Sequence, residues 1–211
     1  MSLLSQKRKM MVVDTLIAEY PDAKCALDHK SVFQLLVATV LSAQTTDASV
    51  NKVTPALFKK APDAKRMAAL SVDEISGCIH SIGMYKQKAK HVSELSKMLC
   101  DKYDGKVPQD YDALTSLPGV GRKTANVVLS VGFGEEHIAV DTHVQRLANR
   151  IGLVATDNVL DTELALMKCI PENKWTKTHH ALIFHGRNVC SAKNPKCEKC
   201  CVENICKKFS I

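Results

Sequence analysis

Four cysteines near the C-terminal end of the chain have a spacing that suits metal binding. Cys190, Cys197, Cys200 and Cys206 follow the pattern C-x6-C-x2-C-x5-C. Four thiolates hold either a zinc ion or an iron–sulfur cluster, and zinc sites usually contain two close C-x2-C pairs. Only Cys197 and Cys200 form such a pair, so the uneven spacing favours a [4Fe-4S] cluster, with zinc as the alternative. Cys201 stands next to a predicted ligand and is interpreted as a bystander.

A second segment with residues suited to chemistry is 117–123, which reads L-P-G-V-G-R-K. The pattern predicts two short helices, 110–116 and 122–131, joined by a tight turn. Gly119 and Gly121 allow positive φ and close approach of a phosphate, and the amides that begin the second helix are anion donors. A bare P-G-x-G is more often an ordinary corner between helices. The longer string L-P-G-V-G-R-K-T-A favours a helix-hairpin-helix element, which holds a duplex without reading its bases.

Lys123 and Asp141 are the candidates for covalent chemistry. Lys123 falls in the first turn of the second predicted helix, where the helix dipole disfavours a cation. In most proteins such a lysine is a solvated side chain; the alternative is a nucleophilic amine, whose neutral form a helix start and partial burial both favour. Asp141 precedes an apolar helical pattern. It is therefore either a simple N-cap or a carboxylate that accepts a proton or stabilises positive charge developing on a sugar.

Helices must position these residues, because apolar side chains recur with a helical period along most of the chain. Within 33–41 they fall at i, i+3, i+4, i+7 and i+8, which indicates one broad apolar face, and 13–20 and 144–151 repeat the pattern. No convincing run of alternating β-branched residues is present, so the sequence predicts an all-α fold. Short loops are expected at Pro21, Pro55, Pro62, Gly83, 105–108, 132–134 and Pro171.

The composition restricts the class of protein. With 211 residues and 45% hydrophobic side chains, the chain can form one large domain or two small ones with a real core. The 29 Lys and Arg against 22 Asp and Glu permit a polyanionic partner, and only 5% aromatic residues argue against base stacking on exposed rings. No signal peptide or membrane span is visible, so we expect a reducing, cytoplasmic location. In that compartment the scattered Cys25, Cys78, Cys100 and Cys169 are expected to be small buried hydrophobes.

In combination, these motifs resemble the endonuclease III family, the bacterial DNA glycosylases and AP lyases of the helix-hairpin-helix superfamily. The resemblance runs from about Ser31 to Cys206. It implies two helical domains that flank a DNA-binding cleft. One is a six-helix barrel that carries the hairpin, residues 25–135, and the other is an iron–sulfur cluster domain, residues 1–24 with 136–211.

The same resemblance assigns roles to individual residues. Lys123 is expected to be the nucleophile and Asp141 its acidic partner. Gln44 resembles the residue that fills the gap left by a flipped nucleotide; alternatively it is a polar residue at a helix end. Met84, where many family members carry leucine, resembles the apolar wedge in the opposite strand; alternatively it packs a loop. The candidate DNA contacts are Gln44, Met84, Gly119, Gly121, Arg122, His143 and Lys193.

The activity that the resemblance implies is base excision on duplex DNA that contains damaged pyrimidines or abasic sites. The enzyme extrudes an oxidised pyrimidine, the Lys123 amine attacks C1′ of the sugar, and a Schiff base forms. β-Elimination then cuts the strand on the 3′ side, and no step needs electron transfer. The lysines around the cysteine segment are either a solvated tail or a basic loop on DNA phosphates. We expect a nucleoid-associated monomer.

Three other functions are compatible with parts of the pattern. An adenine glycosylase of the same superfamily usually lacks a lysine at the position of Lys123 and carries an extra C-terminal domain that 211 residues do not accommodate. A non-catalytic binder that uses the cluster for electron transfer needs neither Lys123 nor Asp141. A zinc-dependent regulator predicts a colourless protein, whereas an iron–sulfur enzyme is yellow-brown.

Overall fold

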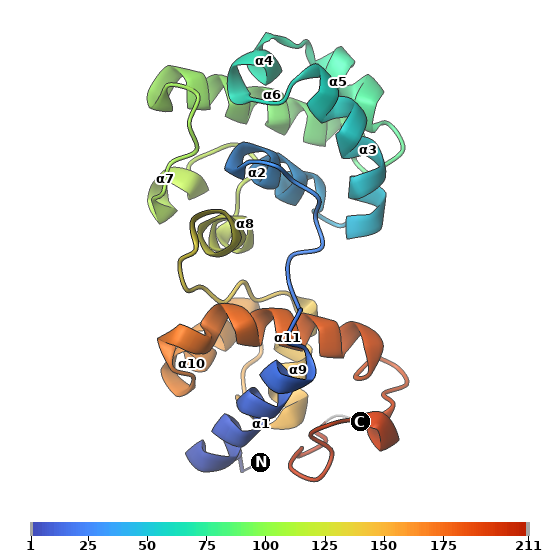
Figure 1. Ribbon diagram of the computed structural model, residues 1–211, viewed down its shortest axis with the longest axis vertical. Helices are drawn as coiled ribbons and strands as arrows, with labels where there is room; N and C mark the ends of the chain where they lie inside the picture. Colours follow the sequence, from blue (N-terminus) through green and yellow to red (C-terminus); the bar gives the residue numbers. More distant parts are fainter. Residues whose placement is uncertain (1, 210–211) are drawn as a thin grey trace. The chain divides into compact units, whose positions relative to one another are not determined.

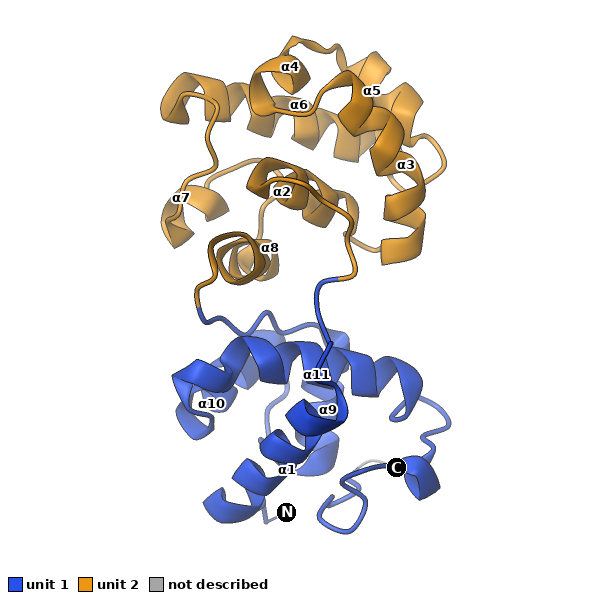
Figure 2. Ribbon diagram, in the orientation of Figure 1, with its two compact units in different colours: residues 1–25, 136–211 blue, residues 26–135 orange. Residues whose placement is uncertain are grey.

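The computed structural model describes residues 2–209, and within that range it consists of helices and loops without a β-strand (Figure 1). The predicted all-α fold is confirmed. The chain divides into two compact units (Figure 2): the hairpin unit, 26–135, and the cysteine unit, which joins the residues up to 25 with those from 136 onward. Residues 1, 210 and 211, the ends of the predicted cluster domain, lie outside the described residues. None of the described helices is long and apolar enough to cross a membrane.

The hairpin unit is a stack of short helices around one central helix. Its elements are α2 (Val32–Leu41), α3 (Asp47–Lys60), α4 (Ala64–Ala69), α5 (Val72–Ile79), α6 (Tyr85–Tyr103), α7 (Tyr111–Thr115), α8 (Arg122–Val127) and the π-helix η1 (Val128–Gly132). The central helix is α2, which packs against α3, α6, α8 and η1. The long helix α6 packs against α4 and α5 as well, so it spans the unit (Figure 1).

The burial of α2 is more complete than its sequence pattern predicts. Every residue from Phe33 to Leu41 is buried, on all sides of the helix and not along one face. The cause is tertiary, because neighbouring helices cover α2 on several sides. Its two buried polar side chains have partners: Thr39 Oγ1 donates to the Leu35 carbonyl at 2.7 Å, and Gln34 Oε1 accepts from the Lys30 amide at 2.9 Å. Because both polar side chains have hydrogen-bond partners, their burial carries only a small free-energy cost.

The prediction of a loop at Pro55 is wrong, because Pro55 lies inside α3. An interior proline removes one helical N–H and crowds the carbonyl four residues earlier, which costs about 3 kcal/mol. Two features of α3 offset this cost. Thr46 caps the helix by accepting from the Ser49 amide at 3.2 Å, and Val53 and Leu57 on either side of the proline are buried.

The predicted hairpin forms, with one local difference in its second helix. α7 begins at the cap Asp110, whose Oδ1 accepts from the Ala113 amide at 2.7 Å. α8 begins at Arg122, as predicted, but the helix changes from α to π at Val128. Close packing accompanies this change, since a Cβ on Gly132 would lie 2.9 Å from the Val32 side chain of α2. Short π segments recur near functional sites.

The cysteine unit packs its helices around a separate core. Its elements are α1 (Gln6–Glu19), α9 (Thr142–Ile151), α10 (Val159–Cys169), the 3₁₀ turn η2 (Glu172–Lys174), α11 (Trp175–Asn188) and the 3₁₀ turn η3 (Cys197–Lys199). α11 (orange in Figure 1) packs against α1 and α9, and α9 packs against α10. The apolar patterns predicted on α1 and α9 face this core, as expected. Of the four scattered cysteines, only Cys169 is buried; Cys25, Cys78 and Cys100 are partly exposed.

Candidate functional site

Lys123 is the second residue of α8 and lies directly behind the glycine turn. The cap residue Gly121 has no side chain that could compete with an anion for the amides at the start of the helix. Partial burial would favour the neutral amine of Lys123, but this residue is exposed, so that condition is not met in the free protein. Sequence alone could not show this, since exposure depends on which segments pack nearby.

The two glycines of the turn have different roles. Gly119 has a φ of +78°, the left-handed conformation that favours glycine, and a Cβ there would lie 2.9 Å from Nδ1 of His91. Gly121 has an extended φ of −98°, and nothing lies within 4 Å of the position of its Cβ. The predicted positive φ is therefore confirmed for Gly119 and wrong for Gly121. Next to the turn, Arg122 donates to the Tyr111 hydroxyl at 3.2 Å and lies over that ring.

Asp141 is the N-cap of α9 in the cysteine unit. Its Oδ1 accepts hydrogen bonds from the amides of His143 at 2.9 Å and Val144 at 3.0 Å. The structural role suggested by the sequence is thus present. In the same turn, Nδ1 of the half-buried His143 lies 3.4 Å from the Arg146 guanidinium. Lys123 belongs to the hairpin unit and Asp141 to the cysteine unit.

Gln44 and Met84 share an unusual backbone conformation. Gln44, in the turn after α2, has a φ of 52°, and Met84, the N-cap of α6, has a φ of 56°. Left-handed φ is uncommon outside glycine and costs on the order of 1–3 kcal/mol, so the surroundings must hold it in place. Both side chains are exposed, and Met84 is 52% exposed, the highest value among the large hydrophobic residues described as exposed. A methionine with half of its surface exposed is a poor packing residue, so the loop-packing alternative is disfavoured.

Sequence reasoning missed Lys88, one turn into α6. Its side chain is 3% exposed, and its Nζ donates to Thr45 Oγ1 at 2.6 Å, next to Gln44. Burial lowers the pKa of Lys88 below its ordinary value. The sequence could have indicated this residue, because Lys88 falls on the apolar face of α6 with Ala89 and Val92, where a lysine is unusual.

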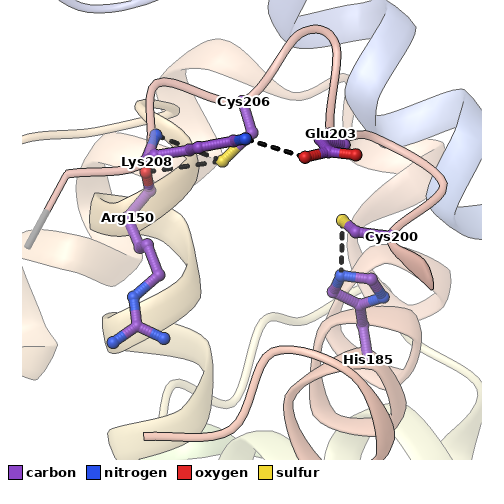
Figure 3. Close-up of polar contacts among 6 residues, drawn as sticks. All are labelled: Arg150, His185, Cys200, Glu203, Cys206 and Lys208. Atoms are coloured by element: carbon purple, nitrogen blue, oxygen red, sulfur yellow. Dashed lines mark hydrogen bonds and ion pairs between the residues drawn. The ribbon is translucent and has the colours of Figure 1, made fainter. Parts of the chain in front are cut away.

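All four predicted ligand cysteines line one pocket of the cysteine unit. The pocket contains about 320 Å³ of space between atoms, part of it open to solvent, and Ile151 and Val189 also line it. Figure 3 shows Cys200 and Cys206 on different sides of this space. Cys201 does not line the pocket but packs against the core, in keeping with its interpretation as a bystander.

Hydrogen bonds to sulfur surround the pocket. The Lys208 amide donates to Cys206 Sγ at 3.3 Å, and Arg150 Nη1 donates to Cys190 Sγ at 3.5 Å. On the opposite wall, His185 Nε2 lies 3.3 Å from Cys200 Sγ (Figure 3). Such donors would stabilise thiolates, the form that binds a metal.

Burial favours the neutral form of two of the pocket's thiols. It raises the pKa of the Cys200 thiol to about 11 and raises the pKa of Cys206 in the same direction. It also raises the pKa of Tyr20 to about 12, so Tyr20 keeps its proton and can donate to His185 Nδ1 at 2.9 Å. That donation leaves the ring proton on Nε2, which faces Cys200. Within residues 2–209, no group of three or more His, Cys, Asp or Glu side chains is placed to hold a metal ion.

Lys193 lies exposed in the loop between Cys190 and Cys197, with other lysines nearby. Arg150 holds this loop to α9, since its guanidinium donates to the carbonyls of Ser191 at 2.8 Å and Ala192 at 3.1 Å. The loop is therefore anchored at its start while its lysine remains accessible.

Known proteins resemble the chain along nearly its whole length. Residues 37–172 match the family described as HhH-GPD superfamily base excision DNA repair protein. Endonuclease III of Bacillus subtilis (strain 168) is 46% identical over 207 residues, with 98% of this chain and 94% of that protein covered. Endonuclease III of Escherichia coli (strain K12) is 40% identical, with 96% of each chain covered.

Solved structures agree. A trapped endonuclease III–DNA covalent intermediate and a non-covalent endonuclease III–DNA complex each match with a TM-score of 0.93 and 47% identity, and the matches cover 98% of this chain and 97% of those chains. A thermostable thymine-DNA glycosylase matches with a TM-score of 0.84 and 25% identity, covering 96% of this chain and 97% of that chain. This chain therefore belongs to the endonuclease III family, within the HhH-GPD superfamily of base excision DNA repair proteins.

Proposed function

We propose that Lys123 is the nucleophile and Asp141 the acidic partner through which this protein excises damaged pyrimidines from duplex DNA. The protein is a base excision repair enzyme, a DNA glycosylase with AP-lyase activity that acts on double-stranded DNA. The observation that carries the assignment is the position of Lys123 in the first turn of α8, directly behind the uncapped glycine turn. A relative of 47% identity has been solved as a trapped covalent intermediate with DNA, and a covalent bond to DNA requires a nucleophile on the protein.

The chemistry balances without an oxidant or reductant. The neutral Lys123 amine attacks C1′, the C1′–N bond to the base breaks, and the base leaves with a proton. The C1′–O4′ bond then breaks, O4′ takes the proton that the amine loses, and the nitrogen forms a Schiff base with C1′ of the opened sugar. Loss of a C2′ proton and cleavage of the bond to the 3′ phosphate complete the β-elimination. The Asp141 carboxylate stabilises the positive charge that develops on the sugar and accepts a proton.

The exposure of Lys123 changes how its activation must be explained. Because Lys123 is exposed, the protein does not enclose this residue before DNA binds. The bound duplex and the extruded nucleotide would then exclude water from the amine and favour its neutral form. The nucleophile would be activated only at the lesion, which limits side reactions elsewhere.

The DNA contacts follow from the exposed residues of both units. We propose that the amides behind Gly121, with Arg122, bind a phosphate, while Gln44 and Met84 enter the duplex as gap filler and wedge. In the cysteine unit, His143 and Lys193 would contact the backbone. We assign the hairpin unit to the predicted barrel domain and the cysteine unit to the predicted cluster domain. We propose a cytoplasmic, nucleoid-associated location because the substrate is double-stranded DNA.

We further propose that Cys190, Cys197, Cys200 and Cys206 bind a [4Fe-4S] cluster. A cubane cluster takes each thiolate at a different iron, so four cysteines spread around one pocket fit it, whereas zinc needs them to converge on a point. The cluster would shape the loop that carries Lys193. Removal of the cluster should weaken DNA binding and lower its dependence on salt concentration, and an unchanged salt slope would count against this role.

Borohydride trapping tests the catalytic assignment. The substrate is a duplex with one thymine glycol, and the proteins are wild type, Lys123→Gln and Asp141→Asn. Only proteins with Lys123 should give a covalent adduct, while Lys123→Gln should still bind the duplex. If Lys123→Gln lost binding as fully as cleavage, Lys123 would be a phosphate contact. Asp141→Asn should bind normally and release the base slowly; normal turnover would reduce Asp141 to a helix cap.

A further inference from the structure

One buried lysine links the two loops that carry Gln44 and Met84. The Lys88 amide donates to the Met84 carbonyl at 3.0 Å, as the first hydrogen bond of α6. The other end of the same residue, Nζ, donates to Thr45 Oγ1 at 2.6 Å. Lys88 therefore contacts the Met84 loop through its backbone and the Gln44 loop through its side chain.

This lysine is not explained by packing alone. Its side chain is 3% exposed, and its partner is a neutral hydroxyl. A charged group in such a place loses its hydration, and burial accordingly lowers its pKa. A methionine of similar length would fill the space without that cost, and exchanging a buried charge for an apolar residue is often neutral or stabilising. The presence of a lysine at this position is therefore better explained by a role in function than by a contribution to fold stability.

The two loops themselves indicate what the gain is. Gln44 and Met84 are both held in the left-handed conformation, and both are exposed. A left-handed non-glycine residue persists only where its neighbours determine it. Thr45 directly follows Gln44 in the chain, and its hydroxyl accepts the hydrogen bond from Lys88.

We propose that Lys88 is a positioning residue that fixes the Gln44 loop against the start of α6, so that the gap filler and the wedge enter the duplex together. The inference rests on the insertion roles proposed for Gln44 and Met84. Lys88 itself does not touch the reacting atoms. Its strong bond from an ammonium to a hydroxyl, shielded from water, is well suited to hold two loops in register.

Removal of either partner of this bond should slow nucleotide extrusion. The variants are Lys88→Met and Thr45→Val, which keep the shape and delete the hydrogen bond, and their double variant. Extrusion is followed by the fluorescence of a 2-aminopurine placed opposite a thymine glycol in duplex DNA. Each single variant should slow the fluorescence rise about tenfold, and the double variant should be no slower than either single one. Thr45→Ser, which restores the hydroxyl, should recover the rate.

Two controls separate positioning from general damage. Lys97→Met removes an exposed lysine from the same helix and so accounts for the loss of one positive charge from the protein. Urea unfolding should show Lys88→Met to be as stable as wild type or more stable. Additive effects of the two single changes, wild-type extrusion rates, or slowing that only follows a lower unfolding free energy would each overturn the proposal.

The proposed function can fail separately. Gln44→Ala and Met84→Ala test the insertion roles; if both extrude the nucleotide at the wild-type rate, those roles are wrong. In that case the link between the loops is tested in the absence of DNA, by measuring the rate of amide hydrogen exchange at residues 43–45. Faster exchange there in Lys88→Met would support the link, and unchanged exchange would refute it.

Discussion

Gly119→Ala tests whether the hairpin depends on one glycine for a structural reason. At this position the backbone has a φ of +78°, so the substitution forces an alanine into the left-handed conformation. The new methyl group would also lie 2.9 Å from Nδ1 and 3.0 Å from Cβ of His91 on α6. Because the Cβ of His91 belongs to the root of a helical side chain, rotation of the ring cannot relieve both contacts.

The two effects can be given magnitudes. An alanine in the left-handed conformation costs roughly 1–2 kcal/mol, and forcing a methyl group into filled space costs about 1–3 kcal/mol. Together they should lower the free energy of unfolding by about 2–5 kcal/mol, which for a chain of this size lowers Tm by roughly 5–15 °C. The turn would also move away from His91, so DNA affinity should fall with it.

Gly121→Ala is the matched control in the same turn. Its φ of −98° suits any residue, and nothing lies within 4 Å of the added methyl group, so its unfolding free energy should stay near that of wild type. Urea unfolding of both variants, with DNA binding measured beside it, makes the comparison. His91→Ala in the Gly119→Ala background should recover part of the loss, because the ring contacts disappear while the contact with Cβ of residue 91 and the φ strain remain. Equal stability of the two glycine variants would refute the reasoning.

Three further predictions concern other residues. Asp141→Ala should lower the free energy of unfolding by about 1 kcal/mol by loss of the α9 cap, whereas Asp141→Asn should preserve it; urea unfolding distinguishes the two. Because burial lowers the pKa of Lys88, its charged form at neutral pH lowers the free energy of unfolding. Stability should therefore rise as the pH climbs through that lowered pKa towards the ordinary value of 10.5, and Lys88→Met should remove this rise. Removal of the proposed cluster should make the segment after Cys190 sensitive to protease while the hairpin unit, with its own core, resists; equal digestion of both units would contradict this.

Sequence reasoning succeeded where the information is local. The glycine turn and both hairpin helices follow from a short string, and the cap role of Asp141 follows from its place before an apolar helical pattern. The gathering of four cysteines around one pocket follows from their closeness in the chain, since most of the lining comes from residues 185–208. Each of these features depends mainly on residues within one short segment of the chain.

Most of the failures share one cause, which is that burial is decided by distant segments; the wrong φ predicted for Gly121 is a local exception. Nothing near Pro55 indicates that α3 continues through it, because the compensating contacts of Val53 and Leu57 are tertiary. Nothing near Lys123 indicates its exposure. The same holds for Lys88, whose partner Thr45 lies 43 positions away in the chain. A lysine in a helix is read as solvated until the neighbouring segment is known.

α6 explains why these distant contacts matter for function. Met84, Lys88 and His91 stand at i, i+4 and i+7, so they share one face at the start of that helix. Met84 is the exposed candidate wedge, Lys88 holds the turn of Gln44 through Thr45, and His91 lies against the hairpin at Gly119. Three segments that are far apart in sequence, each with a proposed DNA contact, thus meet the same stretch of one rigid helix. A shift of that stretch would displace wedge, gap filler and phosphate clamp together. For this reason a change at Lys88 should affect extrusion more than its small effect on stability would suggest.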